Sequence, residues 1–396
     1  MRPRTLASLT GVFAWGLAAC AGPTTTPDPT TAPEATTPAT TPATSPATPA
    51  PTTADGAEMP LGPDGRPFTV AEVATFDTPW AMAFLPGTQT ALVTEREGVL
   101  HLVDTASGEA TEVEGIPDVV ASGQGGLGDV LPGPTFEQDG TVYLSWVESG
   151  SGGTGAVVGR AELITGDAPR LEGLAVIWEQ TPKVSGNGHF SHRLALSPDG
   201  QHLFVSSGDR QEMTPAQDPA SMLGTIMRMN TDGSDAQIWT NGHRNPLGLA
   251  FDADGNLWSS EMGPQGGDEL NLIVEGANYG WPEASMGVHY NGTDIPDHTD
   301  GDGFEAPVAY WVPAMSPGSL MIYTDDAFSG WTGDAFLGGL SGQNLVRVDL
   351  DGTNGDIADT WDMGQRIREV EQGPDGSVWL LEDAPGGRLL HLTPVS

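Results

Sequence analysis

A histidine and an aspartate twenty positions apart form the candidate acid–base pair of this sequence. His189 precedes an apolar stretch at residues 194–196, a Ser-Pro-Asp-Gly turn follows at residues 197–200, and a second strand at residues 202–206 leads to Asp209. Strands joined by such a turn are antiparallel, so we expect His189 and Asp209 at one edge of the hairpin. A histidine oriented by a carboxylate can act as a general base. A structural histidine beside a solvated aspartate is the alternative.

Arginines are placed where they could hold an anion. Arg244 and Asn245 are adjacent at the start of a predicted strand, and a guanidinium beside an amide suits an anion and a carbonyl oxygen. Arg366 and Arg368 alternate onto one face of another strand. Two such cations repel each other unless an anion bridges them. Ion pairing with the plentiful acidic residues is the alternative for this pair.

Two glycine-containing segments are candidates for ligand contact. The bare backbone that follows Gln124 permits the close approach of a ligand, although glycines here also suit a simple turn. Gly263 and Pro264 form a turn that precedes Asp268 and Glu269. Backbone carbonyls with carboxylates nearby suit a hard cation such as Ca²⁺, and an acidic loop without metal is the alternative.

These candidate residues lie within a sequence pattern that is repeated along the chain, and the repeated pattern predicts the fold class. An apolar alternating strand, a turn with Pro, Asp or Gly and a second strand appear about six times, near residues 80–94, 138–146, 194–206, 247–260, 328–350 and 367–381. With few helical stretches, this pattern predicts an all-β, six-bladed β-propeller. Charged residues follow several second strands, and equivalent strand ends should surround a single mouth. We expect residues 263–319 to be a loop insertion over that face.

The N-terminal residues predict secretion and a lipid anchor. Arg2 and Arg4 precede an apolar run at residues 6–19, which ends in Leu-Ala-Ala before Cys20, the only cysteine. This ending resembles a bacterial lipobox and implies a signal peptide at residues 1–19, with lipidation of Cys20. An ordinary signal peptide is the alternative. Residues 20–57 are mostly Thr, Pro and Ala, which predicts a disordered tether, and residues 58–396 should form the propeller. We therefore expect an extracytoplasmic protein that meets the membrane only through its lipid.

The charge balance excludes one class of partner. Fifteen basic and 53 acidic residues give a formal net charge of −38 with histidine neutral. A polyanion of this size repels nucleic acid, so we expect no nucleic-acid partner. Lys183 is the only lysine, and several of the arginines lie inside the Gly-containing motifs.

The motifs, taken in order, resemble those of the soluble quinoprotein sugar dehydrogenases, the glucose/sorbosone dehydrogenase family. The resemblance runs from about residue 78 to residue 390 and is specific as an ordered set. Its motifs are Gln124-Gly-Gly-Leu127, Gly188-His189-Phe190, Ser207-Gly208-Asp209, Gly242-His-Arg-Asn-Pro246, Gly263-Pro264, Asp268-Glu-Leu-Asn271, Asn278-Tyr-Gly-Trp-Pro282 and Arg366-Ile-Arg368.

The resemblance implies a six-bladed propeller that binds pyrroloquinoline quinone (PQQ) and Ca²⁺ in its mouth. His189 would be the base and Asp209 its orienting partner. The resemblance also implies that Arg244 and Asn245 bind the quinone oxygens and that Arg366 and Arg368 bind the PQQ carboxylates. Gln124 would contact cofactor or substrate. The carbonyls of Gly263 and Pro264 would bind Ca²⁺.

The sequence departs from the family pattern in two places. Glucose-oxidising members place a lysine on the cofactor in the segment that here spans residues 339–343, and this chain has none there. His192 occupies a position where a small residue is usual, and we expect it to narrow the pocket.

The hypothesis is a tethered, PQQ- and Ca²⁺-dependent dehydrogenase that oxidises aldoses at the anomeric carbon to lactones and passes electrons to an external acceptor. A non-catalytic cell-surface propeller that binds carbohydrate or protein is one rival. A Ca²⁺-dependent propeller hydrolase is another. Both leave the pair Arg366 and Arg368 unexplained.

Overall fold

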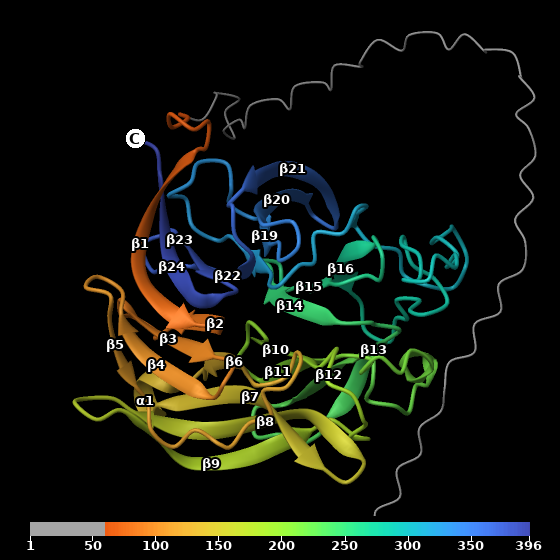
Figure 1. Cartoon of the computed structure of the whole chain (residues 1–396), viewed down its shortest axis with the longest axis horizontal. Helices are drawn as coiled ribbons and strands as arrows, with labels where there is room; N and C mark the ends of the chain where they lie inside the picture. Colours follow the sequence, from red (N-terminus) through yellow and green to blue (C-terminus); the bar gives the residue numbers. More distant parts are fainter. Residues whose placement is uncertain (1–59) are drawn as a thin grey trace, which may run out of the picture. The chain divides into compact units, whose positions relative to one another are not determined.

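The computed structural model describes residues 60–396, so the predicted signal peptide, Cys20 and the tether lie outside the described residues. Six four-stranded antiparallel sheets are arranged in a ring (Figure 1). The predicted six-bladed β-propeller is therefore confirmed. In the described part of the chain, no helix has the length and apolar character needed to cross a bilayer.

The first three blades follow one another directly along the chain. The strands of blade 1 are β2 (Pro79–Phe84), β3 (Thr90–Glu95), β4 (Val99–Asp104) and β5 (Glu109–Glu112). Those of blade 2 are β6 (Leu127–Pro132), β7 (Thr141–Gly150), β8 (Gly153–Ile164) and β9 (Arg170–Glu179). Those of blade 3 are β10 (Ser191–Leu196), β11 (His202–Ser207), β12 (Thr225–Asn230) and β13 (Gln237–Asn241).

The remaining blades close the ring. Blade 4 contains β14 (Pro246–Phe251), β15 (Leu257–Glu261), β16 (Asp268–Ile273) and β17 (Ala309–Trp311). Blade 5 contains β18 (Met321–Ile322), β19 (Ala335–Gly338), β20 (Asn344–Asp351) and β21 (Asn354–Asp362). Blade 6 contains β22 (Ile367–Gln372), β23 (Val378–Glu382), β24 (Pro385–Pro394) and, from the other end of the chain, β1 (Phe68–Asp77).

The pairing of β1 with β24 joins the two ends of the described chain within one sheet. Its register runs from Phe68 opposite Pro394 to Asp77 opposite Pro385. Because the first strand completes the last blade, the ring is held closed by main-chain hydrogen bonds and not only by packing. The only helical elements described are the short turns α1 (Phe136–Asp139) and η1 (Thr214–Gln217).

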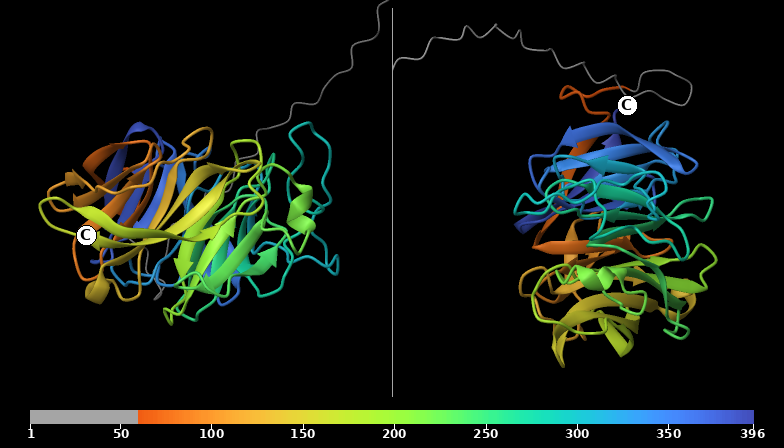
Figure 2. Two further views of the ribbon diagram at one scale, coloured as in Figure 1. Left: turned by 90° about the horizontal axis from the view of Figure 1, so that it is seen from below. Right: turned by 90° about the vertical axis from the view of Figure 1, so that its right-hand side faces the viewer.

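The hydrophobic core lies between neighbouring blades, whose sheets face one another (Figure 2). Six buried clusters each join strands of adjacent blades. A sheet that packs on both sides must be apolar on both faces, which explains the nearly continuous apolar run of β2. The largest cluster, between blades 5 and 6, stacks Phe328 on Trp331 with ring centroids 4.1 Å apart.

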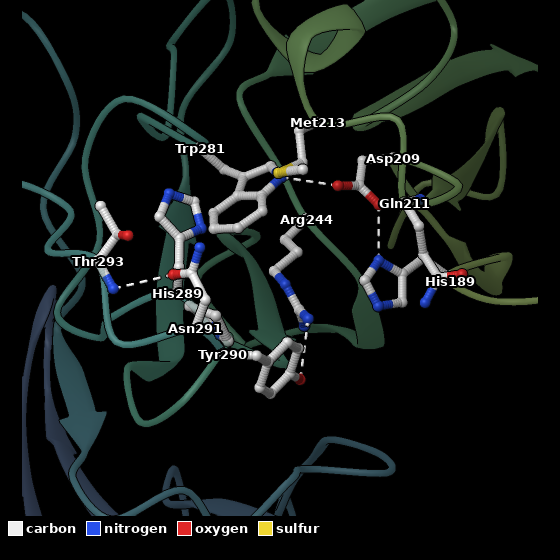
Figure 3. A pocket seen from close by; sticks show the side chains of 11 residues that line it. His189, Asp209, Gln211, Met213, Arg244, Trp281, His289, Tyr290, Asn291 and Thr293 are labelled. Atoms are coloured by element: carbon white, nitrogen blue, oxygen red, sulfur yellow. Dashed lines mark hydrogen bonds and ion pairs between the residues drawn. The ribbon is translucent and has the colours of Figure 1, made fainter. Parts of the chain in front are cut away.

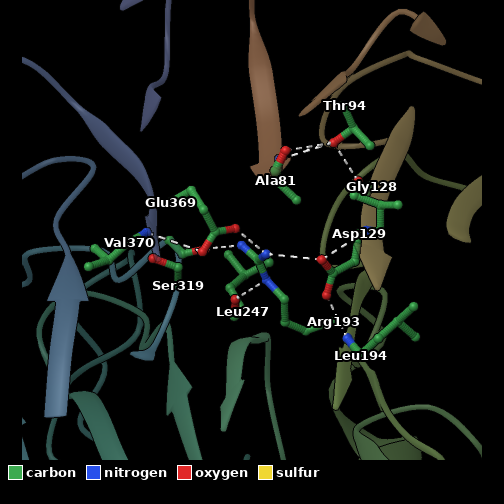
Figure 4. Close-up of polar contacts among 12 residues, drawn as sticks. Ala81, Thr94, Gly128, Asp129, Arg193, Leu194, Leu247, Ser319, Glu369 and Val370 are labelled. Atoms are coloured by element: carbon green, nitrogen blue, oxygen red, sulfur yellow. Dashed lines mark hydrogen bonds and ion pairs between the residues drawn. The ribbon is translucent and has the colours of Figure 1, made fainter. Parts of the chain in front are cut away.

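One buried arginine at the centre of the ring contacts all the other blades, and Figure 4 shows its contacts with Leu247, Asp129 and Glu369. Arg193 of β10 donates to the carbonyls of Leu247 and Gly318 and to the carboxylates of Asp129 and Glu369. Its guanidinium also lies 4.2 Å from the ring centre of Trp80 in blade 1. Arg193 therefore fixes the innermost strands relative to one another.

A cavity of about 370 Å³ on the ring axis is strongly acidic. Asp129, Glu369 and Glu371 line it together with the single cation Arg193. Burial and neighbouring carboxylates raise the pKa of Glu369 to about 7 and the pKa of Glu371 well above its ordinary value. The environment of this cavity therefore favours the protonated forms of Glu369 and Glu371.

The structure corrects the predicted boundaries in two places. The first strand of blade 5 is the two-residue β18, not a strand near Phe328, because residues 323–334 form an aromatic-rich loop. The predicted insertion at residues 263–319 contains β16 and β17, so the loop proper spans residues 274–308. β16 has only a short alternation of apolar and polar residues, and the glycines before it favour a loop, so the sequence pattern does not predict this strand.

Candidate active site

His189 and Asp209 meet at the edge of the hairpin formed by β10 and β11. Ser191 is paired with Ser207, which places His189, two residues before β10, beside Asp209, two residues after β11. The His189 Nδ1 atom lies 2.6 Å from Asp209 Oδ1. Gly208 permits this approach, because a Cβ atom there would lie 2.1 Å from the carbonyl oxygen of His189. The predicted pair is thus brought together.

Backbone strain is concentrated around this pair. Six of the ten non-glycine residues with positive φ in residues 60–396 are His189, Ser191, His192, Arg210, Gln211 and Met213. For His189 the angle is 51°, in the left-handed region that most side chains avoid. Such conformations persist where surrounding contacts impose them, and they are common at functional sites.

A large cavity opens beside His189 (Figure 3). Its volume is about 630 Å³, and it is lined by Gln211, Met213, Arg244, Pro264, Trp281, His289, Tyr290, Asn291 and Thr293 in addition to His189 and Asp209. Five of these residues, from Trp281 to Thr293, belong to the loop at residues 274–308. This loop therefore forms one wall of the cavity, as expected for an insertion over the mouth.

Three groups hold the acid–base pair in place, and one of them, Trp281, comes from the same loop. The indole Nε1 of Trp281 donates to Asp209 Oδ2 at 2.7 Å, and the backbone N–H of Gln211 donates to Asp209 Oδ1 at 2.7 Å. The backbone N–H of His189 donates to Gln124 Oε1 at 2.6 Å. Because a carboxylate can only accept, the tautomer of His189 that fits this contact carries its proton on Nδ1 and leaves Nε2 as an acceptor.

Arg244 lines this cavity and contacts Tyr290, which also lines a second cavity. Its guanidinium donates to the carbonyl of Met262 at 2.9 Å and to the hydroxyl of Tyr290 at 3.1 Å, and it lies 5.3 Å from the ring of Trp281. The adjacent Asn245 accepts a hydrogen bond from Ser191 Oγ at 3.0 Å. Tyr290 lines both cavities.

The second cavity, here called the mouth cavity, has a volume of about 310 Å³ and receives residues from all six blades. Its polar and charged lining residues are Arg96, Gln124, Ser191, Asn245, Ser316, Arg366, Arg368 and Asp383, with Tyr290 at its boundary. This volume falls in the range of about 300–1,000 Å³ typical of small-molecule sites.

Arg366 and Arg368 lie together at this cavity, on the same carboxylate. Asp383 Oδ2 accepts from Arg366 Nη2 at 2.6 Å and from Arg368 Nη2 at 3.1 Å. Burial opposes ionisation of Asp383, but Arg368 and Arg366 hold its pKa below the ordinary value. This contact is the ion pairing with an acidic residue that was the alternative for the pair, so the protein itself supplies a bridging negative charge. The side chain of Arg366 remains 43% exposed, so it can also reach a ligand.

Three guanidinium nitrogens around the two cavities are buried without a hydrogen-bond partner among the described residues. They are the Nε atoms of Arg96, Arg244 and Arg368. Buried cationic donors are normally paired, because loss of water without replacement is costly. Because each of the three residues lines one of the two cavities, an anionic ligand would supply the missing acceptors.

Gly263 and Pro264 border a small third cavity of about 10 Å³, next to Glu261 and Glu269. Burial and the nearby Glu261 and Asp268 raise the pKa of Glu269 to about 8. Within residues 60–396, no three or more His, Cys, Asp or Glu side chains surround one metal position. A cation here would therefore depend on backbone oxygens as well as carboxylates, which is compatible with Ca²⁺.

One expectation about an individual residue was wrong. His192 does not narrow the pocket: it is buried, stacks on Trp80 and shares a 2.8 Å hydrogen bond with Ser145 Oγ. Gly128 provides the space for its ring, since a Cβ atom there would lie 2.0 Å from it. Among the strand-end charges, Glu148 pairs with Lys183 and lines neither the cavity beside His189 nor the mouth cavity, as ordinary strand-end polarity predicts.

Sequence reasoning gave no role to Trp281 or Tyr290, although Trp281 stands within a recognised motif, and it placed Arg96 only among the strand-end charges around the mouth. Trp281 and Tyr290 reach the site from an irregular loop of blade 4, which has no periodic signal. Arg96 was visible as a charge at the end of a second strand, and that position was the available clue.

Comparison with known proteins supports the architecture. The sequence profile named "Glucose / Sorbosone dehydrogenase" matches residues 76–391. The chain is 36% identical over 338 residues to the aldose sugar dehydrogenase YliI of Escherichia coli, covering 80% of this chain and 90% of the relative.

Two solved structures extend this similarity. A crystal structure of a glucose dehydrogenase superposes with a TM-score of 0.78 at 38% identity, covering 83% of this chain and all of the other. The PQQ-bound aldose sugar dehydrogenase of Streptomyces coelicolor superposes with a TM-score of 0.70 at 30% identity, covering 82% of this chain and 98% of the other.

Proposed function

The chain belongs to the glucose/sorbosone dehydrogenase family of oxidoreductases, and from that premise we propose that it oxidises aldoses at the anomeric carbon to lactones with PQQ and Ca²⁺. The observation that carries the proposal is the set of buried arginine donors without partners at the cavity beside the His189–Asp209 pair and at the mouth cavity. A hydrolase that acts on a neutral sugar would leave these donors without a partner.

The residues around the mouth cavity fit PQQ. Arg366 and Arg368 would hold its carboxylates, and Arg244 with Asn245 would hold the quinone oxygens. Gln124, which accepts the backbone N–H of His189, would place the base against the ring. The carbonyls of Gly263 and Pro264 would hold Ca²⁺. When bound, PQQ accepts the hydride and Ca²⁺ polarises the carbonyl that receives it.

The chain's own contribution is to take and hold a proton. Asp209 fixes the Nδ1–H tautomer of His189, so Nε2 faces the cavity as the acceptor of the anomeric hydroxyl proton. As that proton leaves, the C–H electron pair leaves as hydride, and the sugar becomes a lactone. Trp281 and Tyr290 offer aromatic surfaces against which a sugar ring can pack.

The remaining steps involve partners outside the chain. Two electrons per sugar must pass to an external acceptor, and we propose that this takes place extracytoplasmically, with the protein held by the lipid on Cys20.

The test is reconstitution of the full chain with PQQ and Ca²⁺, followed by reduction of a soluble redox dye with a panel of aldoses. Sugar-dependent reduction is expected, and His189→Ala should abolish it. His202→Ala, at the far end of β11, is the matched control and should retain activity. Sugar binding without dye reduction would instead support a non-catalytic propeller.

A further inference from the structure

Arg96 follows β3 and lines the mouth cavity beside Arg366 and Arg368. Whereas those two arginines share Asp383, Arg96 has no acidic partner within residues 60–396, and its buried Nε has no hydrogen-bond partner. In a chain with 53 acidic residues, a partly buried arginine without an acid is not explained by packing alone. Its partner is expected to be a ligand.

The backbone of Arg96 is fixed by two neighbours. Its N–H donates to the carbonyl of Thr78 at 3.2 Å, and its carbonyl accepts the N–H of Leu127 at 3.0 Å. Gly126, with φ of 124°, permits this contact, since a Cβ atom there would lie 2.1 Å from the Arg96 carbonyl oxygen. The main chain is thus locked between blades 1 and 2, which leaves the guanidinium as the part that can meet a ligand.

The charge of the mouth cavity is one-sided. Arg96 comes from blade 1, and Arg366 and Arg368 come from the adjacent blade 6. Asp383 is the only carboxylate in that lining, so three guanidiniums against one carboxylate leave a net charge of +2. Blades 6 and 1 lie across the ring from blades 3 and 4, which carry His189 and Arg244.

We propose that Arg96 is the third guanidinium of a polycarboxylate subsite at blades 6 and 1, and that this subsite holds the carboxylates of the quinone on the side away from His189. The inference rests on the proposed PQQ-dependent function. Arginine is suited to the role because its planar group binds a carboxylate through two parallel hydrogen bonds. Arg96 then also determines which end of the flat ligand faces the base.

The experiment is equilibrium binding of PQQ to the full chain at fixed Ca²⁺, followed by tryptophan fluorescence. Arg96→Gln should raise the Kd by about tenfold or more, and Arg96→Lys by less, because one charge-assisted contact is lost or weakened. Arg170→Gln removes an exposed arginine that pairs with Glu172 and should leave the Kd unchanged. Unchanged thermal unfolding of Arg96→Gln establishes that the variant is folded.

A second pair of probes separates carboxylate recognition from cavity shape. The trimethyl ester of PQQ should bind wild type and Arg96→Gln equally, and benzene-1,3,5-tricarboxylate should displace PQQ from wild type. The inference is overturned if the Kd of Arg96→Gln for PQQ lies within about twofold of the wild-type value. It is also overturned if the substitution raises the Kd for the trimethyl ester as much as the Kd for PQQ. If wild type binds the benzene tricarboxylate through Arg96 but does not bind PQQ, the subsite stands and the proposed function fails.

Discussion

The Nδ1 atom of His189 lies 2.6 Å from Oδ1 of Asp209, although twenty residues separate them. The hairpin of β10 and β11 brings the two together, and Trp281 from the next blade donates to the other carboxylate oxygen. The acid–base pair is therefore built by one blade and fixed by its neighbour.

Asp209→Asn should lower kcat by about 10²–10⁴-fold, with little effect on KM. An amide can donate to Nδ1, which places the histidine proton on Nε2, where the substrate hydroxyl needs an acceptor. Steady-state kinetics with the best aldose measure this. Asp199→Asn, in the turn at the opposite end of the hairpin, is the control. A kcat for Asp209→Asn equal to that of the control would show that His189 is not the base.

Trp281→Phe keeps an aromatic ring but removes the N–H that binds Asp209 Oδ2. We expect kcat to fall by about tenfold, because one buried hydrogen bond to a charged group is lost. Trp239→Phe, which lies on β13 away from the cavities, serves as control. A kcat for Trp281→Phe equal to that of the control would reduce Trp281 to a packing role.

Arg193→Met should destabilise the protein by about 3–5 kcal/mol, because it leaves the buried Asp129 and Glu369 without their cation. Denaturant unfolding followed by tryptophan fluorescence measures the loss. The triple variant Arg193→Met, Asp129→Asn, Glu369→Gln removes the unpaired charges and should recover part of the stability. If the single variant unfolds like wild type, the ring does not depend on this residue.

The acidic cavity makes stability depend on pH. Burial raises the pKa of Glu369 to about 7 and that of Glu371 well above its ordinary value, so the folded state binds more protons than the unfolded state above pH 4.5. The contribution of these groups to stability therefore falls as pH rises from about 5 to 8. Glu371→Gln removes one of the charges and should reduce the drop in Tm between pH 5 and pH 8. A drop equal to that of wild type would mean that Glu371 does not titrate in this range.

Local signals predicted more of the fold than of the site. Each hairpin turn, such as those at residues 197–200 and 374–376, is specified by a few consecutive residues. The apolar alternation of the strands on either side of a turn is likewise a local pattern. Both features can therefore be predicted directly from the sequence. The short strand β18 and the strand β16 inside the expected insertion were missed, because two to six residues carry little periodic signal. The pairing of β1 with β24 depends on residues more than 300 positions apart.

By itself, the sequence determined the repeated β-pattern, the family and the identities of the chemical groups, since these follow from residue type and local spacing. Only the tertiary structure decided which groups meet: Asp383 bridges Arg366 and Arg368, Trp281 binds Asp209, His192 turns away from the site, and Arg96 is left without an acid. The reason is that all these contacts lie where blades converge. Their geometry is set by the packing of six sheets into a ring, which no single stretch of the chain encodes.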